Sequence, residues 1–255
     1  MIENICFREI LFVNKLLKVV LQFKYMKRKR RKVIFGLGIL TFLVLIMFSF
    51  VLENRGFVPE MVFFIFLISF LYVIYDRLNL NLPIFIIFIL SLVPHTLGFL
   101  GFYTVSPLPI QWDHVTHFFP LLATTLMFFN FLHKWMDKKF FSFKTISLVL
   151  IVMLAAMGIG TIIELVEFAG FLFLGFGDGG LFFGAGDACP QFINFTEQII
   201  YSGGGWFNTM YDLIWNDIGI LVGLAIMIFV YYTFPKVLGF YKMRILKKNG
   251  KSKRK

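Results

Sequence analysis

The sequence predicts an all-α membrane protein, a polytopic bundle of about six transmembrane helices. Of its 255 residues, 59% are hydrophobic and 15% are charged, and the mean hydropathy is +0.82. A soluble domain carries roughly 25% charged residues to cover its surface, so this composition excludes a water-soluble enzyme. Six apolar runs are each about 20 residues long, which matches the hydrocarbon core of a bilayer. None shows the alternating pattern of a membrane β-barrel.

The predicted spans follow one another with mostly short connections. The first follows the basic cluster KRKRRK, and a turn containing Arg77 separates the second from the third. The third and fourth contain Pro94 and Pro120, where we expect kinks, made either for packing or beside a polar cavity. The fifth carries Gly158 and Gly160, a pair that we expect to allow close helix packing. The six spans are 33–52, 58–75, 82–100, 114–132, 145–169 and 211–234.

Three segments lie outside the transmembrane domain 33–234 or interrupt it. Residues 1–32 form a basic N-terminal segment, in which 10–23 is either an interfacial helix or lies upstream of the true start at Met26. The glycine-rich segment 170–210 is expected to be an outer loop, either a lid over the cavity or a flexible connection. Residues 235–255 form a basic tail.

Almost all positive charge lies on one side of this topology. The chain has 25 Lys and Arg and a formal net charge of +11, and every one of these residues except Arg55 falls on the side of the two termini. Because cytoplasmic segments are enriched in Lys and Arg, both termini are predicted to be cytoplasmic. The basic segments are therefore topology signals that can touch anionic membrane lipids, and we expect no nucleic-acid partner. The sequence says nothing about protein partners.

Ionisable residues gather at the opposite, outer ends of the spans. His95 and His117 lie in the third and fourth spans, Glu164 near the end of the fifth and Asp217 near the start of the sixth. At 1.5 Å per residue, all four lie roughly 6 to 9 Å inside the outer boundary. Such groups are unfavourable at this depth unless they face a polar environment and pair or bind a cation. The sequence therefore predicts an outer-facing polar cavity between the third and sixth spans.

Helical spacing supports a shared cation site in that cavity. Residues 113 and 117 are four positions apart and residues 164 and 167 are three apart, so each pair projects from one helix face. Several carboxylates with a histidine suit a divalent cation such as Mg, Mn or Zn. The predicted metal ligands are Asp113, His117, Glu164, Glu167 and Asp212.

The remaining polar residues of this region are assigned to substrate binding. They are Asn216, Asp217, His95 and Asp187. We expect the amide to orient a head group, because it lies four residues after an aspartate on one helix face. If the protein is an enzyme, the catalytic base comes from the two glutamates of the fifth span, Glu164 and Glu167.

Simpler interpretations stay open at this stage. Asp113 and Asp212 lie where helix N-caps or partners of the helix dipole are expected, and Glu167 is close enough to the interface to be a surface carboxylate. His114 is offset from the proposed ligands and fits an interface residue. The whole set also fits a proton relay, or a hydrogen-bonded network without chemistry.

Three motifs resemble those of a known family. WDHVTHFFPLL (112–122), IIELVEF (162–168) and YDLIWNDIGILVG (211–223) are similar to the YjdF-type inner-membrane proteins of bacteria and archaea, and more distantly to VanZ-like proteins. The matching positions are Asp113, His117, Phe118, Glu164, Glu167, Asp212, Asn216 and Gly219. This resemblance implies a multi-pass protein of a prokaryotic plasma membrane, but no assigned reaction. Segment 188–208 departs from the pattern as an insertion, and His114 stands where VanZ-like proteins prefer Lys.

The functional hypothesis is therefore divalent-cation-assisted binding or processing of an envelope lipid or a lipid-linked head group. The alternatives are a proton- or ion-coupled transporter and a non-catalytic membrane assembly factor. A transporter needs polar residues in the inner halves of the spans, where the sequence shows few. Whether the protein is an enzyme stays open.

Overall fold

The computed structural model describes residues 29–103, 105–137, 139–174 and 195–233, with side chains described up to residue 169 and again from residue 209. These residues contain helices and turns and no strand, which confirms the all-α fold class. Six helices are long and apolar enough to cross a membrane, and their limits differ from the predicted spans by a few residues. They are Lys29–Val51, Arg55–Ile74, Leu82–Leu100, Trp112–Trp135, Phe143–Ala169 and Thr209–Thr233.

After the first helix, described over Lys29–Val51, the described chain has five long helices and three short 3-10 helices. The elements are η1 (Arg55–Phe57), α2 (Val58–Ile74), α3 (Leu82–Thr96), η2 (Leu97–Leu100), α4 (Trp112–Leu132), η3 (His133–Trp135), α5 (Phe143–Leu174) and α6 (Phe195–Thr233).

Side-chain caps define the starts of two of these helices. The Asn81 side chain accepts a hydrogen bond from the Ile84 amide at 3.0 Å and begins α3. Ser142 accepts one from the Thr145 amide at 3.1 Å at the start of α5. Each cap satisfies one of the amide groups that a helix start leaves without an intrahelical partner.

In the structure, the outer loop is shorter than the predicted range 170–210. Helix α5 continues to Leu174 and α6 already begins at Phe195, so both ends of the expected loop are helical. The three consecutive glycines 203–205, read as loop residues, lie within α6. Only 175–194 remain for a connection, and these residues, with Asp187, lie outside the described part of the chain.

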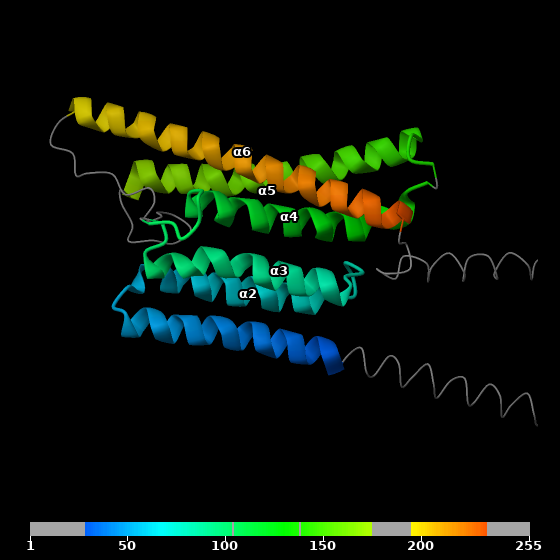
Figure 1. Ribbon diagram of the computed structural model, residues 1–255, viewed down its shortest axis with the longest axis horizontal. Coiled ribbons are helices and arrows are strands. Elements are labelled where there is room, and N and C mark those ends of the chain that lie inside the picture. The colour runs from blue at the N-terminus through cyan, green and yellow to red at the C-terminus, as the bar shows by residue number, and fades with distance from the viewer. Residues whose placement is uncertain (1–28, 104, 138, 175–194, 234–255) are drawn as a thin grey trace, which may run out of the picture.

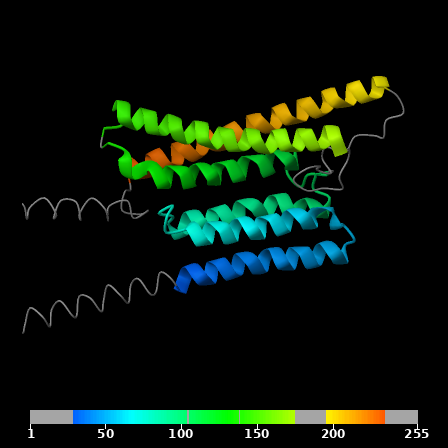
Figure 2. The ribbon, with the colours of Figure 1, turned by 180° about the vertical axis from the view of Figure 1, so that it is seen from behind.

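Helix α4 is the centre of the bundle. It packs against α3 on one side and against α5 and α6 on the other (Figure 1). The first helix and α2 lie beyond α3, and the view from behind shows the same order (Figure 2). Successive helices run in opposite directions, so the start of the first helix and the end of α6 lie at the same end of the bundle.

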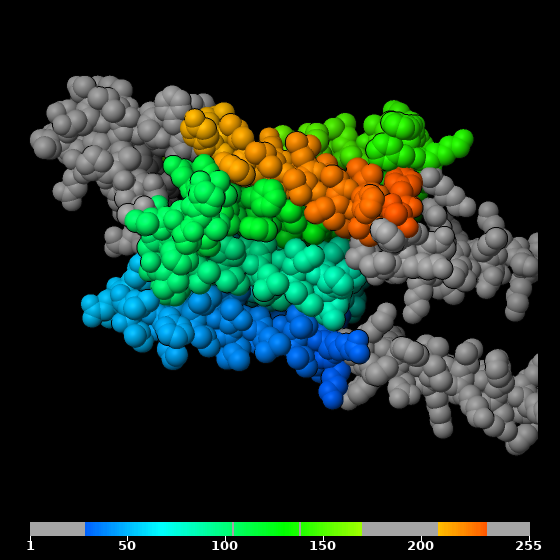
Figure 3. All heavy atoms as spheres, viewed as in Figure 1, coloured from blue at the N-terminus to red at the C-terminus, as the bar shows by residue number. Residues whose placement is uncertain are grey.

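Apolar side chains form both the interior and much of the exterior. Phe42, Phe57, Phe85 and Phe129 are fully buried, and the side chains of α3 and α4 meet across the gap that their ribbons leave (Figure 3). Helix α5 and the first helix expose many large apolar side chains, among them Phe48 and Leu154. Such a surface is unfavourable in water and suits lipid.

Candidate metal centre

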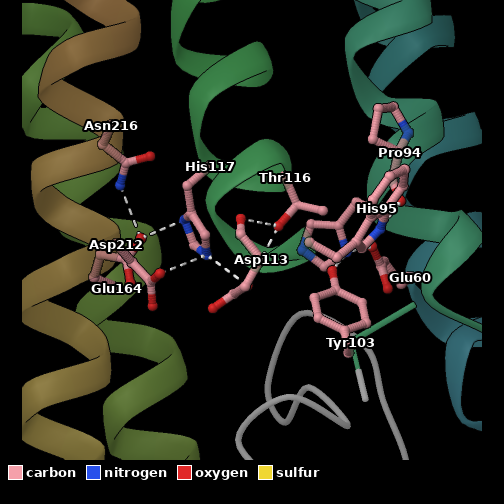
Figure 4. Close-up of polar contacts among 11 residues, drawn as sticks. Glu60, Pro94, His95, Tyr103, Asp113, Thr116, His117, Glu164, Asp212 and Asn216 are labelled. Carbon is pink, nitrogen blue, oxygen red and sulfur yellow. Dashed lines mark hydrogen bonds and ion pairs between the residues drawn. The ribbon is translucent and has the colours of Figure 1, made fainter. Parts of the chain in front are cut away.

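Three helices bring five polar side chains together at the end of the bundle opposite the described chain ends (Figure 4). Helix α4 provides Asp113 and His117, α5 provides Glu164, and α6 provides Asp212 and Asn216. All but Asp113 are buried, and 17% of the Asp113 side chain is exposed. The most accessible side of the cluster is therefore the Asp113 side.

The His117 ring has carboxylates on both of its nitrogen atoms. Nε2 lies 3.3 Å from Asp113 Oδ1 and 3.7 Å from Asp212 Oδ1. Nδ1 lies 2.9 Å from Glu164 Oε1, and that oxygen also accepts a hydrogen bond from Asn216 Nδ2 at 2.8 Å. The amide thus fixes the glutamate, and the glutamate fixes the orientation of the imidazole ring.

This arrangement leaves an excess of negative charge around Nε2. If Nδ1 donates its proton to Glu164, the Nε2 lone pair of a neutral ring faces two acceptor groups. One carboxylate oxygen of Asp113 and one of Asp212 also lie within 4.8 Å of each other, and two ionised carboxylates at that distance repel. A proton or a cation between these groups removes the conflict. The sequence has no Lys or Arg between residues 145 and 235 to supply that charge.

The distances around Nε2 suit a metal ion. An ion about 2.1 Å from each ligand separates neighbouring ligand atoms by ~3.0–3.4 Å. Three such atoms lie within 4.8 Å of one another, one from each of Asp113, His117 and Asp212. A second set, His117, Glu164 and Glu167, meets the same limit on the Nδ1 side of the ring. The five predicted ligands therefore meet in space, but they divide between two sides of one imidazole.

Glycines allow α6 to approach α4 closely enough to form this cluster. A Cβ atom on Gly219 would lie 2.3 Å from the Phe118 carbonyl oxygen of α4, and one on Gly223 would lie 3.0 Å from Thr125 Cβ. These positions continue the helix face that carries Asp212 and Asn216. The close packing of this face therefore places both polar side chains against His117.

The expected glycine pair of α5 behaves differently at its two positions. Gly160 is buried, and a Cβ atom there would lie 3.3 Å from Asn216 Nδ2, which confirms close packing at this residue. Gly158 is exposed, and among the described residues no atom lies within 4 Å of an added Cβ, so its predicted role in close packing is wrong. It points away from the neighbouring helices because it lies two positions from Gly160 on a helix with 3.6 residues per turn.

Neither aspartate is an N-cap, but Asp113 lies in the first turn of α4, where a carboxylate interacts favourably with the helix dipole. The N-cap of α4 is Gln111, so Asp113 lies within the first turn. Asp212 lies well inside α6, which begins at Phe195. Neither carboxylate is explained as a cap, and Glu167 is only partly exposed.

The other predicted binding residues are placed apart from the His117 ring. Asp217 is half-buried on α6, next to Asn216. His95 is on α3, where its Nδ1 atom contacts Glu60 Oε1 of α2 and lies 3.1 Å from the Tyr103 hydroxyl oxygen. His114 stacks on Trp215, with ring centroids 4.9 Å apart, which fits the expected interface position.

Sequence reasoning missed Glu60 and Tyr103. The Glu60 side chain is fully buried, and its Oε2 atom has no hydrogen-bond partner among the described residues. A signal was present, because Glu60 is the one acid in an otherwise apolar span. Burial raises the pKa of Tyr103 well above its ordinary value, and the negative charges of Glu60 and Asp113 raise it further. Tyr103 therefore keeps its hydroxyl proton and lies near both carboxylates.

The inner half of the bundle has more buried polar residues than expected, and two of them, Thr125 and Asn130, form hydrogen bonds within the protein. Thr125 donates to the Leu121 carbonyl of its own helix at 2.8 Å. Asn130 donates to the Asn79 carbonyl at 2.7 Å and accepts from Asn81, which ties the α2–α3 turn to α4. These bonds hold the helices together and leave no evident polar pathway across the described bundle.

The fold and the site together define a multi-pass helical membrane protein with a buried histidine–carboxylate centre. The chain belongs to the DUF2238 family of predicted membrane proteins, whose pattern matches residues 33–233. This is consistent with the YjdF-type resemblance, and the match spans all six transmembrane helices. The more distant likeness to VanZ-like proteins stays a prediction. No curated protein and no solved structure matches the chain.

Proposed function

We propose that the chain binds a divalent cation between Asp113, His117 and Asp212, and that the cation binds the head group of an envelope lipid. The observation that carries this proposal is the contact of His117 Nε2 with two carboxylates while Glu164 occupies Nδ1. Metal-binding histidines commonly donate their second ring N–H to a carboxylate in this way. Mg, Mn and Zn all suit the ligand types.

Unused hydrogen-bonding capacity next to the ring supports a ligand there. Glu164 Oε2 and Asn216 Oδ1 are buried without a hydrogen-bond partner among the described residues. Buried polar atoms in that state are unfavourable, and a bound molecule that donates to them would remove the penalty. In this proposal, Asn216 both holds Glu164 and accepts a hydrogen bond from the head group.

Two features of the site favour a lipid head group as the bound molecule: its depth in the membrane and the coordination positions of the ion that no protein ligand fills. Three protein ligands leave positions on the ion for oxygen atoms of another molecule. The partly exposed side is at Asp113, in the first turn of α4, where the helix reaches the membrane interface. Phosphate and ester oxygens of lipids lie at this level. From the charge asymmetry we expect this end to face outward, and the family resemblance implies a prokaryotic plasma membrane.

In a catalytic version of this function, the cation polarises a phosphoryl or ester oxygen. The catalytic base is then one of the two glutamates of α5, Glu164 or Glu167. Transport is less favoured, because Thr125 and Asn130 of the inner half donate to backbone carbonyl groups of the bundle. An assembly factor without a cation requires that the carboxylates can be neutralised without effect.

Native mass spectrometry of the purified protein tests the proposal. We expect the parent chain to retain one divalent ion and a co-purified lipid, and Asp113→Asn and Asp212→Asn to lose both. Glu53→Gln is the matched control, because it removes one negative charge from an exposed side chain outside both ligand sets and outside the predicted binding residues. Its spectrum should equal that of the parent. A parent chain free of metal after equilibration with Mg, Mn and Zn would contradict the proposal.

A cell-level measurement then tests the lipid part. Head-group analysis of envelope lipids from a strain lacking the protein should show an altered species, restored by the parent gene and not by Asp113→Asn. Restoration by the Asp113→Asn variant would show that lipid handling does not need the cation site.

A further inference from the structure

The Glu60, His95 and Tyr103 side chains form a second buried polar cluster that the proposed function does not use. They come from α2, from α3 and from the segment after η2, and His95 Nδ1 contacts the other two groups. The three groups lie on the far side of Asp113 from His117 (Figure 4). Their position beside the candidate cation site raises the question of how the two clusters are connected.

The segment between α3 and α4 is shaped to hold Tyr103 in place. A Cβ atom on Gly98 would lie 2.0 Å from the Tyr103 ring, so only glycine lets the ring lie against the backbone there. Asn54 Nδ2 donates to the Phe99 carbonyl at 3.0 Å, and Trp112 Nε1 donates to the Pro94 carbonyl at 2.9 Å. These bonds fix the segment to the neighbouring elements on both sides of Tyr103.

From Tyr103 the contacts lead to the cation site. Burial raises the pKa of Tyr103, and a hydrogen-bonding interaction with Thr116 of α4 opposes that rise, which places the two hydroxyl groups close together. Thr116 Oγ1 lies 2.6 Å from the Asp113 carbonyl oxygen and 3.3 Å from Asp113 Oδ1. The same Oδ1 atom lies 3.3 Å from His117 Nε2. A chain of polar contacts therefore runs from Glu60 through His95, Tyr103 and Thr116 to a proposed metal ligand.

We infer that Glu60, His95 and Tyr103 are positioning residues of the cation site, which hold the Asp113 carboxylate toward His117 through the Thr116 hydroxyl group. The inference rests on the proposed cation binding. Groups that hydrogen-bond to a metal ligand fix its orientation, and their loss typically weakens metal binding by about 10- to 100-fold. Helix α2 thereby contributes to a site whose ligands come from α4 and α6.

Cation titrations of the purified chain, with Mn²⁺ as the probe, test this inference. We expect Tyr103→Phe and Thr116→Val each to weaken Mn²⁺ binding by about 10-fold or more. Thr116→Ser keeps the hydroxyl group and should bind like the parent. Tyr211→Phe, which removes the hydroxyl of an exposed tyrosine at the same end, is the control for Tyr103→Phe. The metal-free unfolding temperature of each variant should lie within about 2–4 °C of its control, because no core volume is lost and at most one hydrogen bond is removed.

A double variant, Tyr103→Phe with Thr116→Val, tests whether the residues act in one chain. If they do, it binds Mn²⁺ no more weakly than the weaker single variant. Fully additive losses would overturn the inference, as would parent-like binding by Tyr103→Phe or weak binding by Thr116→Ser. A parent that binds no Mn²⁺ or other divalent ion would refute the proposed function itself. A parent that binds, with an unaffected Tyr103→Phe, would refute only the positioning role.

Discussion

At the scale of single residues, the two nitrogen atoms of His117 assign different roles to carboxylates that the sequence treats alike. Asp113 and Asp212 face Nε2, whereas Glu164 faces Nδ1 and is held by Asn216. The depth of each ligand in the membrane could be predicted by counting residues along its helix. The predicted ligands do lie close together in the structure. Which ring nitrogen each carboxylate faces depends on the rotation and packing of the helices, which no local spacing reveals.

This division predicts unequal effects of two conservative substitutions. Glu164→Gln should keep one cation per chain and weaken its affinity by about 10- to 100-fold, because it removes a group that orients a ligand. Asp212→Asn should abolish binding, because it removes a ligand. Isothermal titration of both variants measures the difference. A different result would place the ion on the Nδ1 side of the His117 ring. In that case Glu164→Gln and Glu167→Gln would abolish cation binding, and Asp212→Asn would only weaken it.

At the scale of elements, the six spans were predictable because each is a continuous apolar run of membrane length. The start of α6 was not, because glycines 203–205 lie within this helix although glycine disfavours helices. The partner of His95 was also not predictable. His95 and His117 share one depth, but α3 turns His95 toward Glu60 and α4 turns His117 toward α5 and α6.

The packing of α6 on α4 gives a prediction at this scale. Gly219→Ala forces a methyl group against the Phe118 carbonyl and should destabilise the bundle by about 1–3 kcal/mol. It should also weaken cation binding, because Asp212 and Asn216 move away from His117. Thermal unfolding in detergent, with and without the cation, measures both effects. Gly158→Ala is the control, since its methyl group meets open space and improves helix propensity. Equal unfolding temperatures for the two variants would contradict this account.

At the scale of the whole molecule, polar and charged groups are separated along the bundle axis. The described chain ends lie together at one end, where Arg31 pairs with Asp76 at 2.8 Å and lies over the Tyr75 ring. The histidine–carboxylate centre lies at the other end. The charge asymmetry predicts that the chain-end side is cytoplasmic, so the centre faces outward. Between the two ends, apolar helices shield the site from the inner side.

The central claim is that a cation lies on the Nε2 side of His117, and locating the ion tests it most directly. In crystals of the protein grown with Mn²⁺, an anomalous difference map should show a peak about 2.2 Å from His117 Nε2, in contact with Asp113 and Asp212. A map with no peak at this position, or with the peak between Glu164 and Glu167, would contradict it.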